Sequence, residues 1–369
     1  MTLYEQRLKR TVDAIQMNPV DKIPFSYSGP AYLAKSQGVK IGKYLSDLKL
    51  ATDTAINFVK QHPGIDSLHS PTMNPHALST LWLSKVKVPG ENLPDDELWQ
   101  VDEQELMKFE DYEKIIKMGY GPWVDDFMKN RLDDPVSKMQ SFIQSSPETF
   151  RRMAVEAEIP VVNALSTGTP FEGFCGGRQL MKFFIDLVEE PELVKAALDK
   201  AMDFLYGKYI AQLDAVKPLS VWIGGWRAAP ELLAHDTWME FVWPYLRKFI
   251  DATIERNVIP ILHFDSCWDK EIVTLKELPP RKCLLMLDGA TDMRKAREIL
   301  DDRMCMMGDV PSTMLAFGSE NEVYNYVTKL IDDVGPKTGL IISSGCDTPL
   351  NAKDENVNAM IQAAADYRI

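Results

Sequence analysis

Short apolar runs recur along the chain, and each run ends in small, polar or turn-forming residues. Eight such runs cover Ile23–Ser28, Ile65–Ser70, Pro160–Thr167, Leu219–Ile223, Val258–His263, Cys283–Leu287, Met304–Met307 and Gly339–Ser343. Runs that are apolar on both faces are typical of parallel strands covered by helices. The pattern therefore predicts eight buried parallel strands.

Helical stretches separate most of these runs. Apolar residues recur at helical spacing over Glu190–Leu213, Thr237–Arg256, Met293–Leu300, Asn321–Val334 and Asn356–Tyr367. A strand–helix alternation that reaches eight strands predicts an α/β fold of the (β/α)8 TIM barrel class. An open, doubly wound sheet has a similar alternation and is the alternative.

The spacing of the runs breaks between the second and third predicted strands, where residues 71–159 form an insertion. Within it, Lys85–Pro89 and Leu98–Val101 alternate like the two strands of a hairpin, and helical segments follow. Long loops of this fold concentrate above the barrel mouth, so we expect a lid there. No linker rich in Gly and Ser interrupts the chain, so residues 1–369 are expected to form one domain.

The composition restricts the classes of partner. The 369 residues are 45% hydrophobic and carry a net charge of −13. Such a surface repels phosphate backbones and anionic lipids, so neither nucleic acid nor a membrane is an expected partner. No apolar run reaches the roughly 18 residues of a bilayer span, and the polar segment Met1–Arg10 does not resemble a signal peptide. Five widely spaced cysteines, an odd number, indicate reduced thiols and a cytoplasmic protein.

One set of residues near the predicted strand ends has the chemistry of a metal site. His263 and Asp265 alternate at the end of the fifth strand, so both side chains can share one face, and Cys346 follows the eighth strand. An imidazole, a carboxylate and a thiolate at one barrel mouth would form a zinc site with an open position. The alternatives are a structural histidine and a cysteine that packs in the core. Cys267 and Cys305 are competing thiols, although Cys305 is expected deep in its strand, and a buried position is expected for Cys283, which begins the sixth strand.

Other side chains are expected around the same mouth. Five of them are candidates to contact a flat substrate, namely Tyr27, His69, Trp123, Phe171 and Trp226. For the aromatic residues, packing of the lid on the barrel is the alternative. Asp288 and Asp309 each lie beside a glycine at a strand end and could act as catalytic acid or base, or cap a helix. The chain contains no GxGxxG, GxSxG, HExxH or CxxC motif.

Long segments resemble the uroporphyrinogen decarboxylase superfamily, namely Arg7–Phe25, Val86–Gln100, Pro170–Leu213 and Trp226–Cys267. The likeness is most specific over Pro230–Asp265 (PELLAHDTWMEFVWPYLRKFIDATIERNVIPILHFD), and it implies a (β/α)8 barrel. True decarboxylases of this superfamily carry an arginine-rich segment after the first strand. The corresponding Ser26–Lys40 has no arginine, so four porphyrinogen carboxylates would lack partners. We therefore expect no porphyrinogen decarboxylation.

The resemblance extends to the corrinoid-dependent methyltransferases of this superfamily, which bind zinc through a His-x-Cys pair and a distant Cys. His263 and Cys346 match two of these ligands, and Asp265 stands where the middle Cys would be. A harder N/O/S donor set suits an oxygen substrate better than a thiol. The chain also looks like veratrol or vanillate corrinoid-protein methyltransferases, O-demethylase components that pass an aryl O-methyl group to cob(I)alamin of a corrinoid protein partner.

This resemblance implies a zinc-dependent enzyme acting on a small aromatic methyl ether, with zinc or an acid such as Asp309 stabilising the phenolate. Methyl transfer from methylcobalamin to a thiol or to tetrahydrofolate stays open as an alternative. So do a metal-free decarboxylase or lyase that uses Asp288 or Asp309, and a module that only binds a corrinoid protein. The oligomeric state, a homodimer included, also stays open.

Overall fold

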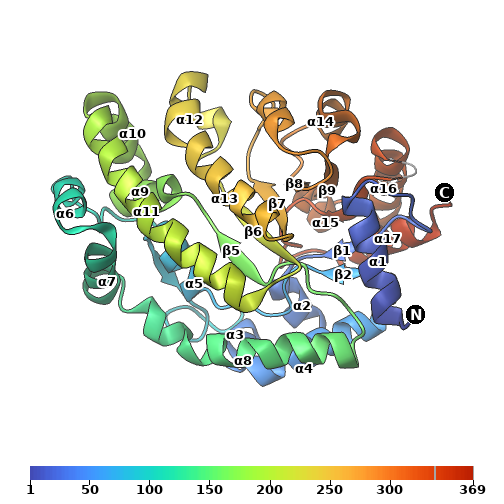
Figure 1. Cartoon of the computed structure of the whole chain (residues 1–369). Coiled ribbons are helices and arrows are strands. Elements are labelled where there is room, and N and C mark those ends of the chain that lie inside the picture. The colour runs from blue at the N-terminus through green and yellow to red at the C-terminus, as the bar shows by residue number, and fades with distance from the viewer. Residues whose placement is uncertain (336–337, 369) are drawn as a thin grey trace.

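Within the described residues, eight parallel strands lie at the centre of the molecule with helices around them (Figure 1). The computed structural model describes residues 1–335 and 338–368. Six strands form one parallel sheet in the order β10-β9-β8-β7-β6-β5. Their bounds are β5 Leu165–Thr167, β6 Ser220–Gly225, β7 Ile259–Phe264, β8 Leu284–Leu287, β9 Cys305–Val310 and β10 Leu340–Ser344.

Two short strands close this sheet into a barrel. β1 (Ser26–Tyr27) and β2 (Ser67–Leu68) pair in parallel. Parallel bridges then join Phe25 to Ile342 of β10 and Leu68 to Val161, just before β5. The pairing of strands therefore runs all the way round. This confirms the predicted (β/α)8 barrel and excludes the open doubly wound sheet. All eight predicted strand ranges overlap an observed strand, although β1, β2 and β5 are shorter than predicted.

The helices of the barrel itself are α1 Leu3–Ile15, α2 Pro30–Ser36, α3 Ile41–Ser46, α4 Leu48–Gln61, α9 Pro170–Arg178, α10 Leu180–Glu189, α11 Pro191–Val216, η1 Pro230–Leu232, α12 His235–Phe241, α13 Trp243–Glu255, η2 Ile272–Glu277, α14 Met293–Leu300, η3 Asp301–Arg303, α15 Ser312–Phe317, α16 Glu320–Val334 and α17 Asp354–Asp366. The single helix predicted over residues 237–256 is divided at Val242 into α12 and α13. Pro244 lacks an N–H and fits only the first turn of a helix, so a new helix begins there.

The interior of the barrel is filled from one end. Alternate residues of the strands point inward and form an apolar cluster with α1, made of Ala14, Ile15, Met17, Val162, Ile261, Leu284, Met286, Cys305, Met307 and Ile341. Because α1 closes the amino-terminal end of the barrel, a functional site can form only at the opposite end, where the strands finish. No helix in the described part of the chain combines the length and apolar character that a bilayer crossing needs.

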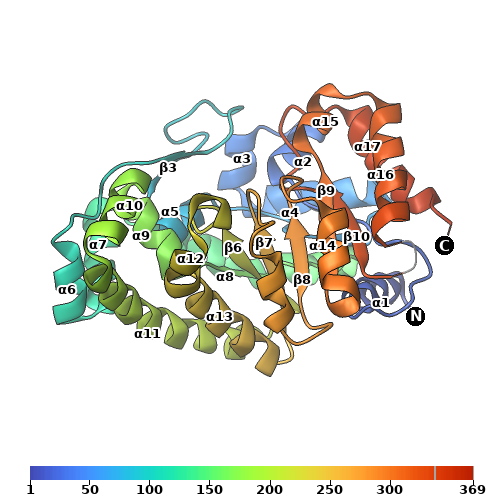
Figure 2. The ribbon, with the colours of Figure 1, turned by 90° about the horizontal axis from the view of Figure 1, so that it is seen from above.

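The insertion between β2 and β5 contains the predicted hairpin, in which β3 (Lys85–Lys87) pairs antiparallel with β4 (Gln100–Asp102). In Figure 2 the hairpin lies on the side toward which β8 points, the side of the barrel mouth. The helices of the insertion are α5 His76–Trp82, α6 Asp111–Met118, α7 Tyr120–Arg131 and α8 Pro135–Glu156. Of these, α8 packs on α4 and α5, while α6 and α7 pack on α11, so they extend the outer helical layer.

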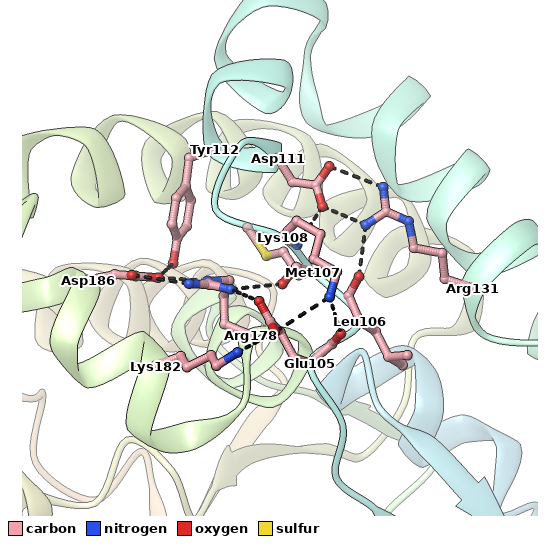
Figure 3. Close-up of polar contacts among 10 residues, drawn as sticks. All are labelled: Glu105, Leu106, Met107, Lys108, Asp111, Tyr112, Arg131, Arg178, Lys182 and Asp186. Carbon is pink, nitrogen blue, oxygen red and sulfur yellow. Dashed lines mark hydrogen bonds and ion pairs between the residues drawn. The ribbon is translucent and has the colours of Figure 1, made fainter.

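A polar network fastens the segment after the hairpin to α9 and α10 (Figure 3). Arg178, buried at the end of α9, donates to Asp186 at 2.7 Å, to Glu105 at 2.7 Å and to the carbonyl of Met107 at 3.2 Å. Tyr112 of α6 donates to the same Asp186 at 2.9 Å. Buried, charge-assisted bonds of this kind fix the path of residues 105–112 across the outside of α9.

Candidate metal centre

Three side chains with metal-binding atoms meet at the mouth of the barrel. His263 lies near the end of β7, Asp265 follows that strand, and Cys346 follows β10. One ligand atom from each lies within 4.8 Å of the other two, and His263 Nε2 is 3.2 Å from an oxygen of Asp265. The structure thus brings together the three residues that the sequence analysis singled out.

Close backbone packing positions His263 and Asp265. A Cβ on Gly224 of β6 would lie 2.3 Å from the carbonyl oxygen of His263, so only glycine permits this spacing of β6 and β7. After the strand, the N–H of Ser266 donates to Asp288 at 2.9 Å. Ser266 itself has a φ of +75°, a conformation that needs support from its surroundings. Asp288 provides that support and so fixes the turn that carries Asp265.

The loop that carries Cys346 is fixed by two neighbours. A Cβ on Gly345 would lie 2.4 Å from the carbonyl oxygen of Asp288, so this loop and the one after β8 are in direct backbone contact. On the other side, Ser28 donates its hydroxyl to Asp347 at 2.6 Å. Cys346 is therefore held between the ends of β8 and β1.

The electrostatics of the three residues favour a cation between them. Burial by itself would lower the pKa of His263, but its bonds to Asp265 and Cys346 and their charges raise that pKa to about 10. Cys346 is exposed at the rim, yet its ligand atom faces His263, and desolvation raises the pKa of its thiol. Asp265 and Cys346 thus favour a proton on the imidazole. A divalent cation would take the place of that proton and would release the proton of the Cys346 thiol.

The donor set fits zinc. One nitrogen, one oxygen and one sulfur ligand leave a fourth tetrahedral position for a substrate atom. Nε2 of His263 is the ring nitrogen that faces Asp265, so His263 would bind through that nitrogen.

Two more side chains lie beside His263. His69, which follows β2, is buried, and its Nε2 has no hydrogen-bond partner among residues 1–335 and 338–368. Burial first, and then the charge of His263, lowers the pKa of His69 to about 3, so its imidazole is neutral. The ring of Trp222 on β6 lies 5.4 Å from the ring of His263. The sequence analysis missed Trp222. This residue stands two positions before Gly224, which pairs with His263, so the two-residue period of the strand places its side chain on the same inward face.

Comparison with known proteins gives the family. The family model described as uroporphyrinogen decarboxylase (URO-D) matches residues 124–367. The chain belongs to the uroporphyrinogen decarboxylase family.

Curated relatives and a solved structure agree with this assignment. The chain is 24% identical to the uroporphyrinogen decarboxylase of Alkalilimnicola ehrlichii over 66% of this chain and 69% of that protein. It is 23% identical to the enzyme of Sodalis glossinidius over 62% of this chain and 68% of that protein. A methyltransferase from Methanosarcina mazei shares the fold with a TM-score of 0.73 and 17% identity, over 98% of both chains.

In this family member, three of the aromatic residues expected at the mouth lie in the core instead. Tyr27 donates its hydroxyl to the carbonyl of Gly29 at 2.9 Å, and its ring packs 4.6 Å from Phe58 of α4, outside the barrel. Trp123 packs among Tyr120, Phe127 and Phe174 between α7 and α9, and Phe171 packs edge-on to Phe183 of α10. Helices of the outer layer cover all three rings. Trp226, by contrast, follows β6 and remains partly exposed.

The two aspartates considered as acid or base lie outside the three-residue group. Asp309 is 3% exposed and accepts a bond from Tyr326 of α16 at 2.7 Å, so its carboxylate faces the outer helices, where burial raises its pKa. Asp288 accepts from the backbone N–H groups of Ser266 and Ala290. Its carboxylate therefore orders the loops.

The other cysteines are not part of the group. Cys283 and Cys305 are fully buried, as expected, and burial raises the pKa of both thiols to about 12. Neither thiol belongs to the group of ligand atoms at the mouth. Cys267 is partly exposed, and its N–H donates to Glu231.

Proposed function

We propose that this protein is a corrinoid-protein-dependent methyltransferase that cleaves an aryl methyl ether. The methyl–oxygen bond breaks, the methyl group passes to cob(I)alamin of a partner protein, and the aromatic product leaves as a phenolate. The observation that carries the proposal is the convergence of His263, Asp265 and Cys346 at the barrel mouth, with their ligand atoms within 4.8 Å of one another.

His263, Asp265 and Cys346 would hold a zinc ion, which as a Lewis acid stabilises charge on the leaving oxygen. The remaining work falls to the neighbouring side chains. His69 Nε2 is unpartnered and its ring is neutral, so it can hydrogen-bond a polar group of the substrate. Trp222 offers an aromatic face beside the metal centre. Asp265 in place of a second thiolate makes the site harder, which favours an oxygen substrate over a thiol.

The shared fold with a methyltransferase supports this proposal at the level of architecture. The curated relatives are named as decarboxylases, but Ser26–Lys40 offers no arginine for a porphyrinogen. The partner implied is a soluble corrinoid protein docked over the mouth, in the cytoplasm.

The test combines metal analysis with a methyl-transfer assay. Wild-type protein is expected to contain close to one zinc per chain and to methylate a reduced corrinoid protein in the presence of methoxybenzenes, followed by the absorbance of cobalt. Cys346→Ala should lose both zinc and transfer. Cys267→Ala is the matched control, since Cys267 is a nearby thiol outside the three-residue group, and should keep both. Full transfer by metal-free Cys346→Ala would refute the proposal.

A further inference from the structure

A second group near the barrel mouth lacks partners. Arg227 follows β6 by two residues and is 0% exposed. None of its three guanidinium nitrogens has a hydrogen-bond partner among the described residues. A guanidinium carries five N–H donors, and native proteins seldom bury donors without acceptors.

Aromatic rings flank this guanidinium. Its carbon lies 4.1 Å from the centre of the Trp226 ring and 5.4 Å from that of the Trp82 ring, which ends α5. Rings stabilise the charge through cation–π attraction but accept no in-plane hydrogen bond. The edge of the guanidinium therefore remains available to a planar acceptor.

Two carboxylates lie near Arg227, and neither satisfies it. Glu172, in the first turn of α9, uses its oxygens to accept the backbone N–H groups of Ala228 at 2.8 Å and of Arg227 at 3.3 Å. Glu103, which follows β4, approaches an Nη atom of Arg227 only to 3.8 Å. That distance allows charge attraction but is too long for a hydrogen bond.

Arg227 belongs to the same rim as the metal centre. The carboxyl group of Glu172 lies against Gly225, where a Cβ would be 2.1 Å from it. The carbonyl of Gly225 accepts the N–H of Asp265 at 3.4 Å. Arg227 and the metal centre therefore sit on the ends of the neighbouring strands β6 and β7, linked through one residue.

We propose that Arg227 binds a carboxylate of the substrate, so that the methyl donor is an aromatic ether carrying a carboxyl group. The inference rests on the proposed function and names its substrate class. A carboxylate is planar and pairs side by side with a guanidinium through two bonds.

Glu103 acts as the competitor in this scheme. Its side chain is 28% exposed and lies between solvent and the fully buried Arg227. It also accepts the N–H of Leu180 at 2.8 Å, and two residues later Glu105 is bonded to Arg178 in the network of Figure 3. The segment is thus held over Arg227, and the incoming carboxylate takes the place of the Glu103 carboxylate.

The experiment measures binding of 3-methoxybenzoate and of methoxybenzene to the zinc-loaded protein by calorimetry. Wild type should bind the benzoate at least about 10-fold more tightly, because charged hydrogen bonds are worth about that factor. Arg227→Met should remove this preference and leave the affinity for methoxybenzene unchanged. Glu103→Gln should bind the benzoate more tightly, by about 3-fold or more, since a competing charge is gone.

Glu103→Gln keeps the test decisive even where Arg227→Met fails to fold. If Arg227 were only a structural partner of Glu103, Glu103→Gln would lower the melting temperature and would not improve benzoate binding. That result, or equal wild-type affinity for the two ligands, overturns the proposal. The lysine variant Arg227→Lys should restore part of the preference, because it keeps charge but not the planar geometry.

Failure of this inference is distinct from failure of the proposed function. Equal rates of methyl transfer from the two ethers would overturn the role of Arg227 and leave the methyltransferase in place. Binding of benzoate that depends on Arg227, without methyl transfer to any reduced corrinoid protein, would overturn the methyltransferase and leave the carboxylate site.

Discussion

Asp288 accepts the backbone N–H of Ser266 at 2.9 Å and so orders the turn that carries Asp265. Its own carbonyl lies against Gly345, next to Cys346. Asp288, which lies outside the three-residue group, therefore positions two of the three proposed metal ligands. Supporting residues of this kind commonly contribute 10- to 100-fold to metal affinity, on the order of 1–3 kcal/mol.

Replacing Asp288 should therefore weaken zinc binding while the three ligands remain. We expect Asp288→Ala to lower the zinc affinity by about 10-fold or more, measured by titration against a competing chelator. Asp309→Asn is the control, since Asp309 faces Tyr326 and an amide oxygen can still accept that bond. Equal zinc affinity in Asp288→Ala and wild type would contradict the positioning role.

Glycine at position 345 should be required for the Cys346 loop. A methyl group there would meet the Asp288 carbonyl at 2.4 Å, so Gly345→Ala should displace the loop, lower zinc content and destabilise the fold by about 1–3 kcal/mol. Gly207 lies within α11, and a new methyl group there would have no atom within 4 Å. Gly207→Ala should therefore raise the free energy of unfolding by up to about 1 kcal/mol. Urea unfolding and metal analysis of both variants show whether Gly345→Ala acts through this steric clash or merely through the loss of a glycine.

His69 should contribute to turnover without holding the metal. Because its Nε2 is unpartnered and its ring neutral, His69→Leu removes a hydrogen bond to substrate and should lower kcat/KM by about 10-fold. Zinc content should stay at the wild-type level. Loss of zinc in this variant would instead make His69 a fourth ligand.

Glu172 should make stability depend on pH. Burial raises its pKa from 4.5 to about 7, although the Ala228 N–H and the Arg227 charge oppose the shift. The folded state therefore holds a proton that the unfolded state releases, so this contribution is complete below about pH 4.5 and is lost as pH rises through about 7. The loss amounts to about 3 kcal/mol.

Glu172→Gln should abolish that dependence, since an amide does not titrate. Its free energy of unfolding relative to wild type should rise between pH 5 and pH 8, measured by urea unfolding at each pH. A constant difference over this range would show that Glu172 ionises normally in the folded protein.

Much of the architecture follows from local pattern. Apolar runs such as Val258–His263 and Cys283–Leu287 predict strands because burial on both faces requires apolar side chains at almost every position. The observed β7 and β8 begin and end within one residue of these runs. The inward direction of His263 and Asp265 follows from the two-residue period of a strand. Since the ends of parallel strands meet at one rim of a barrel, the sequence also predicts that Cys346 lies near them.

Tertiary packing decided the rest. Nothing in the local sequence predicts that the ring of Tyr27 faces α4 whereas the ring of Trp222 faces His263. The same holds for Asp309, which faces Tyr326, and for Arg227, which is buried between two indoles. Period and composition determine which residues can be buried, whereas the neighbours that bury them come from elements far away in the chain. The amino-acid sequence thus determined the barrel and the three side chains proposed as ligands, and only the packed structure decided which other side chains surround them.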